Sequence, residues 1–434
     1  MENKYAAVVA ERTSEELLQL LQEREQYEPE VVLAVVDELE RRGVAGPELM
    51  EMRQEAERLQ QAQRELAQQP GTTAEKLQDF GKLFVPQPGY FITPILLDLN
   101  LLAFGLMLLL GINFMDPDAA SLIAIGGNFG PYTLSGEWWR LLTCVFLHAG
   151  IIHLAFNMLA LVSVGRVLEP LVGKWPFLIA YLLCGLAGSI TSLWWDSMRA
   201  GVGASGAIFG MFGMLLVIML LEQKLHWQQK KGMLLNLGFV LVLNLAFGMK
   251  SGIDNAAHSG GLVCGLLFGT VLLLRSNRQI TQQYSAKGNA VMAGVGLLLL
   301  LVFYQSVPFT GQARLAYTLD QVGNKEAQAM HVLQALVEEG EKAKAADFVP
   351  LLEQGVSQLN ESIILLQGID DATGADKDRI TVMLQYLLLR KQSFELLRDN
   401  LQQHRPWQNP RQEQLLRTIN QYVSNLQKGE PQEK

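Results

Sequence analysis

Cysteine and charge are both scarce in this chain, and each shortage narrows what the protein can be. Three cysteines occur among 434 residues, Cys144, Cys184 and Cys264, and all lie in or beside apolar runs. Their spacings match neither a disulfide framework nor a zinc site, so we interpret them as small packing residues. Only 18% of residues are charged, and the net charge of −8 without a basic patch argues against a nucleic-acid partner.

Several common signals are also missing. The N-terminus lacks a basic stretch followed by an apolar one, so we expect no secretory signal peptide. His148, His153 and His258 were considered as zinc ligands, but no His-Glu-x-x-His motif accompanies them, and we predict no metal and no other cofactor. The chain has no intramembrane pair of acidic residues and no Gly-x-Ser-x-Gly after a strand, which argues against an aspartyl protease and a soluble hydrolase elbow.

Long apolar runs fill the middle of the chain. A helix needs about 20 apolar residues to cross a bilayer core. Seven runs approach that length, and the polar flanks are rich in Glu, Gln, Lys and Arg. We therefore predict an all-α polytopic membrane protein with spans near 94–114, 148–171, 175–196, 204–222, 232–249, 256–274 and 289–306.

The distribution of Lys and Arg over the short loops predicts the orientation, because such residues favour the cytoplasmic side. With the N-terminus inside, the opposite loops carry three of these residues, Arg140, Arg199 and Lys250. The inner loops carry eight, namely Arg166, Lys174, Lys224, Lys230, Lys231, Arg275, Arg278 and Lys287. We therefore predict a cytoplasmic N-terminus and an extracytoplasmic C-terminus.

Composition divides the chain into four parts. Residues 1–92 form a cytosolic helical domain and linker, with a helix-start signal at Thr13 and further helices after Pro29 and Pro47. Residues 93–275 form the transmembrane core, and 276–306 a cytoplasmic loop with the seventh span. Residues 307–434 alternate helical patterns with turns, in the style of a helical-repeat domain, but without a recognisable repeat period.

Two polar residues lie at the beginnings of apolar spans, where burying a polar group in the membrane raises the free energy of the protein. Ser205 lies in Gly203-Ala204-Ser205-Gly206, where a helix N-terminus favours developing negative charge. Small residues at 206, 210 and 213, and at 261, 265 and 269, allow two spans to pack closely. Such packing would bring Ser205 within reach of His258 as a general base. Asp254 lies one turn before His258 and could orient it, but we assign it to the solvated loop and predict a dyad.

A third polar cluster opens another span. His153 and Asn157 lie four residues apart on one helical face, and both supply hydrogen-bond donors. Aimed at an attacked carbonyl, they would form an oxyanion hole. By the predicted topology, all three clusters lie at one depth in the outer half of the membrane. The structural alternative for His153 and Asn157 is a hydrogen bond between helices. For His258 it is a bond to a neighbouring backbone carbonyl, and for Ser205 it is helix packing through small residues. We assign a structural role to His148.

At these residues the chain resembles the rhomboid family of intramembrane serine proteases, over about residues 94–275. The resemblance is carried by Trp139-Arg140, His153-x-x-x-Asn157, Gly203-x-Ser205-Gly206 and the His258 helix with its glycines. It implies a six-helix core with Ser205 as nucleophile and His258 as base. It also implies an oxyanion hole of His153, Asn157 and the Ser205 backbone N–H, with Gly203 and Phe209 supporting. Arg140 would be structural.

The resemblance implies an endopeptidase that cuts membrane-anchored proteins in or near their transmembrane segments, in a bacterial plasma membrane. The alternative is a non-proteolytic relative that binds membrane clients for quality control. The presence of both dyad residues favours the enzyme, and a transporter is disfavoured because the spans show no clear inverted repeat. The seventh span and the two terminal domains depart from the minimal core, and we expect the latter to recruit substrates or adaptors.

Overall fold

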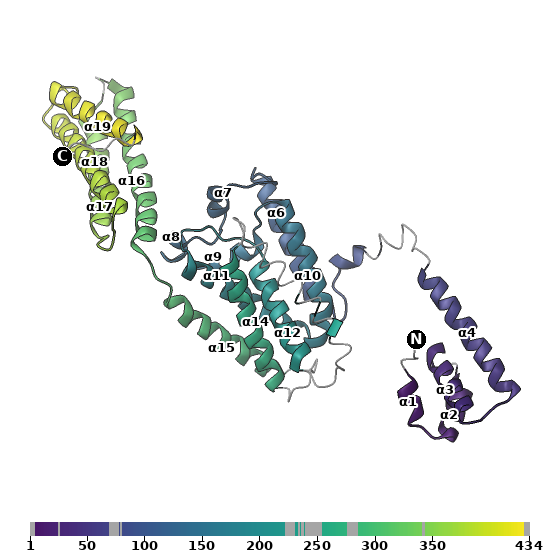
Figure 1. Cartoon of the computed structure of the whole chain (residues 1–434). Coiled ribbons are helices and arrows are strands. Elements are labelled where there is room, and N and C mark those ends of the chain that lie inside the picture. Colours follow the sequence, from purple (N-terminus) through teal and green to yellow (C-terminus); the bar gives the residue numbers. More distant parts are fainter. Residues whose placement is uncertain are drawn as a thin grey trace. The chain divides into compact units, whose positions relative to one another are not determined.

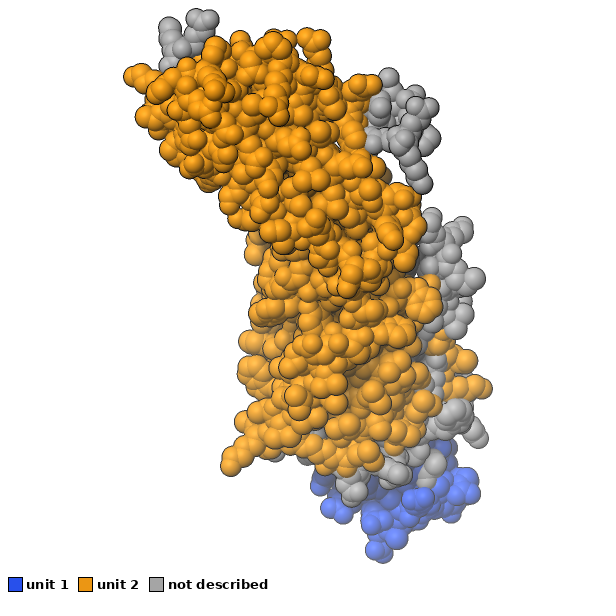
Figure 2. Space-filling view, turned by 90° about the vertical axis from the view of Figure 1, so that its left-hand side faces the viewer, with its two compact units in different colours: residues 1–82 blue, residues 83–434 orange. Residues whose placement is uncertain are grey.

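A computed structural model describes most of the chain (Figure 1). The described residues are 5–24, 27–68, 78, 80–221, 231–232, 235, 238, 254–275, 285–340 and 343–428. They form two compact units, Met1–Lys82 and Leu83–Lys434, coloured separately in Figure 2. The division between them falls ahead of the expected boundary at residue 92, while the boundaries at 275 and 306 stay predictions.

The first unit is a small helical domain made of α1 (Ala6–Ala10), α2 (Ser14–Gln22), α3 (Pro29–Arg41) and α4 (Pro47–Gln68). Thr13 caps α2 as predicted: its hydroxyl accepts the Glu16 N–H, and the Glu16 carboxylate accepts the Thr13 N–H. The valines and leucines at helical spacing on α3 are buried against α2 and α4. This unit therefore has its own hydrophobic core.

Within the described residues, five helices are long and apolar enough to cross a membrane. They are α6 (Ile92–Leu109), α10 (Ile151–Val172), α11 (Lys174–Trp195), α14 (Asn255–Arg275) and α15 (Ala286–Gln305). A sixth apolar helix, α12 (Ser205–Leu221), is shorter at 17 residues. These match six of the seven predicted spans, and the other, 232–249, lies almost entirely outside the described residues.

Glycines set the closest helix contact of the core, between α12 and α14, which run side by side in Figure 1. A Cβ on Gly261 would lie 1.9 Å from the Gly206 carbonyl oxygen, and one on Gly265 would lie 1.9 Å from that of Gly210. Only a residue without a side chain fits at either place. The sequence-based prediction that these two small faces pack together is confirmed.

A buried carboxylate joins α6 to α10. Glu169, 1% exposed, accepts hydrogen bonds from the backbone N–H groups of Phe91, Ile92 and Thr93 and from the Thr93 hydroxyl. These are the N–H groups that a helix start leaves without intrahelical partners, and the negative charge also suits the helix dipole. The start of the first span is thereby anchored on the second.

The long connection between α6 and α10 is folded into short helices: α7 (Ala119–Ala124), α8 (Gly130–Thr133), α9 (Arg140–Thr143) and the 3-10 turn η3 (Cys144–Phe146). A further 3-10 turn, η2 (Lys82–Phe84), precedes α6. Arg140 is 6% exposed and donates to Glu137 and to the carbonyls of Ile123 and Gly127. Its role in this loop is structural, as the resemblance implied.

Four antiparallel helices follow the last span: α16 (Gly311–Glu339), α17 (Ala345–Gln367), α18 (Ala375–Gln402) and α19 (Pro410–Lys428). Each packs against the next around a continuous apolar core, as the helical patterning predicted. The beginning of this array contacts the first loop: the rings of Tyr317 and Tyr132 meet edge to face with centroids 5.9 Å apart. Burial, and then the charge of Asp320, raise the pKa of Tyr132.

Candidate active site

Three helices of the core begin with polar side chains. His153 is the third residue of α10, Ser205 the first of α12, and His258 the fourth of α14. Gly203 brings the first two together: a Cβ built on it would lie 3.0 Å from His153 Nε2 and 3.8 Å from Ser205 Oγ. The imidazole of His153 and the hydroxyl of Ser205 therefore border the same small space.

Gly203 fits this place for two reasons. Its φ of +123° lies in a region that residues with side chains rarely adopt, and a Cβ would approach His153 Cε1 to 2.7 Å. Backbone hydrogen bonds to Cys144 and to Asn128 hold the segment before Ser205. Gly203 donates to the Cys144 carbonyl at 2.8 Å, and Gly201 exchanges two bonds with Asn128 at 2.9 and 2.8 Å.

His258 reaches the same region from α14. It is 5% exposed, and its ring stacks on Phe209 with centroids 4.1 Å apart and planes 9° from parallel. Phe209 lies one turn after Ser205 on α12, and a Cβ on Gly206 would lie 3.3 Å from the Ala257 carbonyl oxygen. Ser205 and His258 thus stand at the same level of the α12–α14 contact.

The structure records no hydrogen bond between Ser205 and His258 among the residues it describes, and it leaves His258 Nδ1 without a partner there. Catalytic hydrogen bonds are often long before substrate binds, so this geometry is compatible with a base next to a nucleophile. Phe209 is the aromatic contact of the histidine that the resemblance implied.

His153 presents a donor to the site. Its Nδ1 accepts the Ala149 N–H at 3.3 Å, so in the neutral ring the proton belongs on Nε2, which would lie 3.0 Å from a Cβ built on Gly203. The Asn157 amide donates to the His153 carbonyl at 2.9 Å and has a second hydrogen. His148 packs its ring 5.3 Å from that of His153 and bonds the Phe146 carbonyl through Nδ1, a structural role as predicted.

The position of Asp254 one turn before His258 suggests that it could orient that residue. We expected a solvated loop residue, but the side chain is half-buried, accepts the Ala257 N–H at 2.9 Å and accepts the Ser192 hydroxyl at 2.5 Å. An Asp directly ahead of an apolar run is a helix-cap signal that could have shown the first bond. Nothing local marks the second, because Ser192 belongs to another helix.

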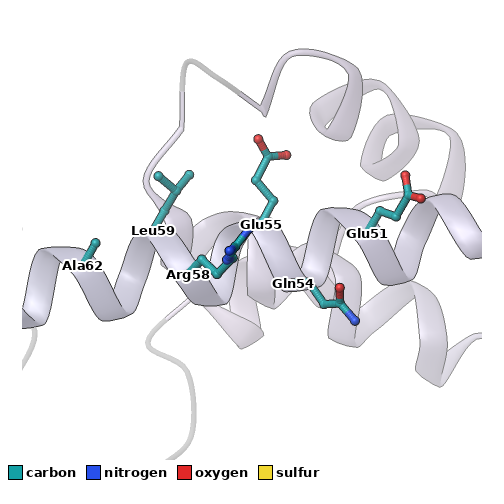
Figure 3. A pocket seen from close by; sticks show the side chains of 6 residues that line it. All are labelled: Glu51, Gln54, Glu55, Arg58, Leu59 and Ala62. Carbon is teal, nitrogen blue, oxygen red and sulfur yellow. The ribbon is translucent and has the colours of Figure 1, made fainter.

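A surface hollow of the described residues lies elsewhere. Figure 3 shows its lining on one side of α4, in the first unit: Glu51, Gln54, Glu55, Arg58, Leu59 and Ala62. It is shallow and contains none of the predicted site residues. Among the described residues, no three His, Cys, Asp or Glu side chains gather as a metal site.

Comparisons with known proteins agree with this arrangement. The Rhomboid domain family matches residues 135–275, which include His153, Asn157, Ser205 and His258. Rhomboid protease GluP of Bacillus subtilis is 34% identical over 280 residues, covering 64% of this chain and 50% of GluP. Rhomboid protease AarA of Providencia stuartii is 34% identical over 182 residues, covering 37% of this chain and 65% of AarA.

The chain spans about half the length of GluP and of RHOMBOID-like protein 5 of Arabidopsis thaliana, at 50% and 52%. It covers more of YdcA from Bacillus subtilis, which is 37% identical over 155 residues, or 36% of this chain and 76% of YdcA. The matched domain, these identities and the apolar helices lead to one conclusion: the chain is a helical multi-pass membrane protein that belongs to the rhomboid family.

Proposed function

We propose that this protein is an intramembrane serine endopeptidase that cuts membrane-anchored proteins in or near their transmembrane segments. One observation carries the proposal: the first turns of α10, α12 and α14 bring His153, Ser205 and His258 to one region. Relatives that are named rhomboid proteases support the same class of reaction.

In the proposed reaction, His258 takes the proton from the Ser205 hydroxyl as its oxygen attacks the scissile carbonyl. His153, Asn157 and the Ser205 backbone N–H stabilise the oxyanion, and donors of this kind are each worth roughly 3 kcal/mol. His258 then returns the proton to the leaving amine, and water hydrolyses the acyl-enzyme. Gly203 keeps space open for the peptide, and Phe209 holds the imidazole plane. These steps need no metal or organic cofactor.

The excess of Lys and Arg in one set of loops supports a cytoplasmic N-terminus and an extracytoplasmic helical tail. The site then opens toward the outer side of what we propose to be a bacterial plasma membrane. The terminal helical domains would recruit substrates or adaptors. Deleting residues after 310 tests this part: unchanged cleavage of every native substrate contradicts it.

Reconstitution with a panel of single-span substrates tests the activity. We expect cleavage by the wild type and by S163A, because the Ser163 hydroxyl on α10 donates to the Leu159 carbonyl of its own helix. We expect no substrate cleavage by S205A or H258A. Fluorophosphonate labelling should require Ser205. Cleavage that survives S205A overturns the nucleophile assignment. A wild type that binds such substrates without cleaving or labelling favours the non-proteolytic client-binding alternative.

A further inference from the structure

The carboxylate of Asp254 joins two helices at the level of the proposed site. Asp254 directly precedes α14, and its Oδ1 accepts the Ala257 N–H at 2.9 Å, while its backbone carbonyl accepts the His258 N–H at 3.1 Å. Its Oδ2 accepts the hydroxyl of Ser192, in the last turn of α11, at 2.5 Å. One residue therefore caps α14 and attaches its first turn to α11.

The same carboxylate borders the segment that leads to Ser205. A Cβ built on Gly201 would lie 3.6 Å from Asp254 Oδ2 and 3.6 Å from the Ser192 hydroxyl. Gly201 is held in turn by its two backbone bonds to Asn128. Asp254 thus lies where α11, α14 and the chain before the nucleophile meet.

His258 depends on this anchor for its position. Its Nδ1 has no hydrogen-bond partner in the described part of the chain, so no hydrogen bond at that nitrogen orients the ring. The stacked Phe209 and the first turn of α14, which carries the histidine, both contribute to the position of the ring. A capping side chain stabilises such a first turn, and without it the turn frays.

We propose that Asp254 is a positioning residue for the general base. It acts through the α14 backbone and Ser192, aligning His258 with Ser205 without touching the imidazole. This inference rests on the proposed function. It differs from a catalytic triad, because the carboxylate orders the helix that carries the histidine and leaves the ring nitrogen free.

Five variants test it: D254A, D254N, S192A, the double variant D254A/S192A and the control S189A. Ser189 lies on α11 like Ser192, but among the described residues its hydroxyl bonds Gly185 and Cys144 and no residue of α14. Misplacing a catalytic group by about 1 Å costs about a hundredfold in rate. We expect D254A to lower kcat about tenfold to a hundredfold per fluorophosphonate-titrated site, with KM unchanged.

D254N should rescue kcat to within about threefold of wild type, because Asn caps helices as well as Asp and its amide can bond the Ser192 hydroxyl. S192A should lower kcat less than D254A, and the double variant should be no worse than D254A, since both changes break one connection. S189A should match wild type.

The inference is overturned by an unchanged kcat in D254A, by a loss explained by the fraction of unfolded protein in thermal denaturation, or by a rise in KM alone. Equal losses of kcat in D254N and D254A also overturn it. The hydrogen bonds from residue 254 to Ala257 and Ser192 would then not account for the effect on kcat. An active wild type with any of these results leaves the proposed function standing. An inactive, unlabelled wild type removes the proposed function, and the inference with it.

Discussion

Gly203 is constrained both by its backbone conformation and by the neighbouring His153 ring. A substitution at a second glycine that has only the first constraint can separate the two effects. A side chain there would be strained by the φ of +123° and would also meet the His153 ring. Gly136 supplies the matched control, since its φ is +117° but no atom of the described residues lies within 4 Å of a Cβ built on it.

We predict that G203A and G136A both lose stability, by about 1–3 kcal/mol, from backbone strain. Only G203A should also lose activity, by about tenfold or more, because its methyl group displaces His153 from the space beside Ser205. Substrate cleavage normalised to folded protein measures the difference. Equal activity in the two variants would show that His153 does not need its present position.

Glu38 on α3 supports a prediction about pH. Hydrogen bonds from Arg41 and then Arg42 lower the pKa of its carboxyl from 4.5 to about 2. The pKa is lower in the folded state, so this contribution to stability is present above pH 4.5 and is lost as the pH falls toward 2.

Hydrogen exchange of the α2 and α3 amides in the whole protein, compared at pH 5 and pH 3 after correction for intrinsic rates, measures this loss. We expect protection to fall with pH in the wild type. The fall should be smaller in E38Q, where only groups such as Glu16 still titrate, its pKa being lowered by the Thr13 backbone N–H. An identical pH dependence in both proteins would contradict the role of Glu38.

The contact between α12 and α14 gives a prediction at the scale of helices. G261A places a methyl group 1.9 Å from the backbone oxygen of Gly206, which cannot rotate away. Overpacking of this kind typically costs about 1–3 kcal/mol, and separating the helices also moves Ser205 from His258. We expect a lower Tm and weaker fluorophosphonate labelling.

G294A on α15 is the control for this experiment, because a Cβ at that glycine would have no atom within 4 Å in the part of the chain that the structure describes. It should retain the wild-type labelling rate and Tm. If G261A also retains both, the close approach of α12 and α14 is not required.

The same pair of helices shows what sequence can predict. Glycines four residues apart define a helix face by local spacing alone, so the α12–α14 pairing was predictable. The meeting of Phe209 with His258 was implied by the family resemblance and not by spacing. The bond between Asp254 and Ser192 was not, because it joins residues 62 apart and a serine in an apolar helix carries no sign of its partner. The hydrogen bonds that Glu169 accepts were not predictable either, because they depend on where α6 begins.

At the scale of the whole second unit, the end of α15 is part of the core's structure. Val307, 8% exposed, packs in a buried cluster with Leu141 of α9 and with Ile190 and Leu193 of α11. Just before it, the Tyr304 hydroxyl donates to the Thr133 carbonyl of α8 at 2.8 Å. The seventh span thus holds the first loop against α11, a connection that nothing in the resemblance explained.

That loop leads to the site by a short path. The Thr133 hydroxyl donates to the Asn128 side chain, which donates to the Ser189 carbonyl, and the Asn128 backbone pairs with Gly201 ahead of Ser205. Loosening the end of α15 should therefore lower both the stability of the core and the order of the segment before the nucleophile.

V307A tests this, with V302A as control because Val302, on α15 itself, is 63% exposed, whereas Val307 follows the end of the helix and is buried. Removing two buried methyl groups should cost roughly 1–3 kcal/mol in V307A and little in V302A. Thermal denaturation measures the stability, and hydrogen exchange at Gly201 and Gly203 measures the order of the segment. Faster exchange there in V307A alone is the expected result. Exchange that matches V302A would mean that the seventh span packs on the core without acting on the segment before Ser205.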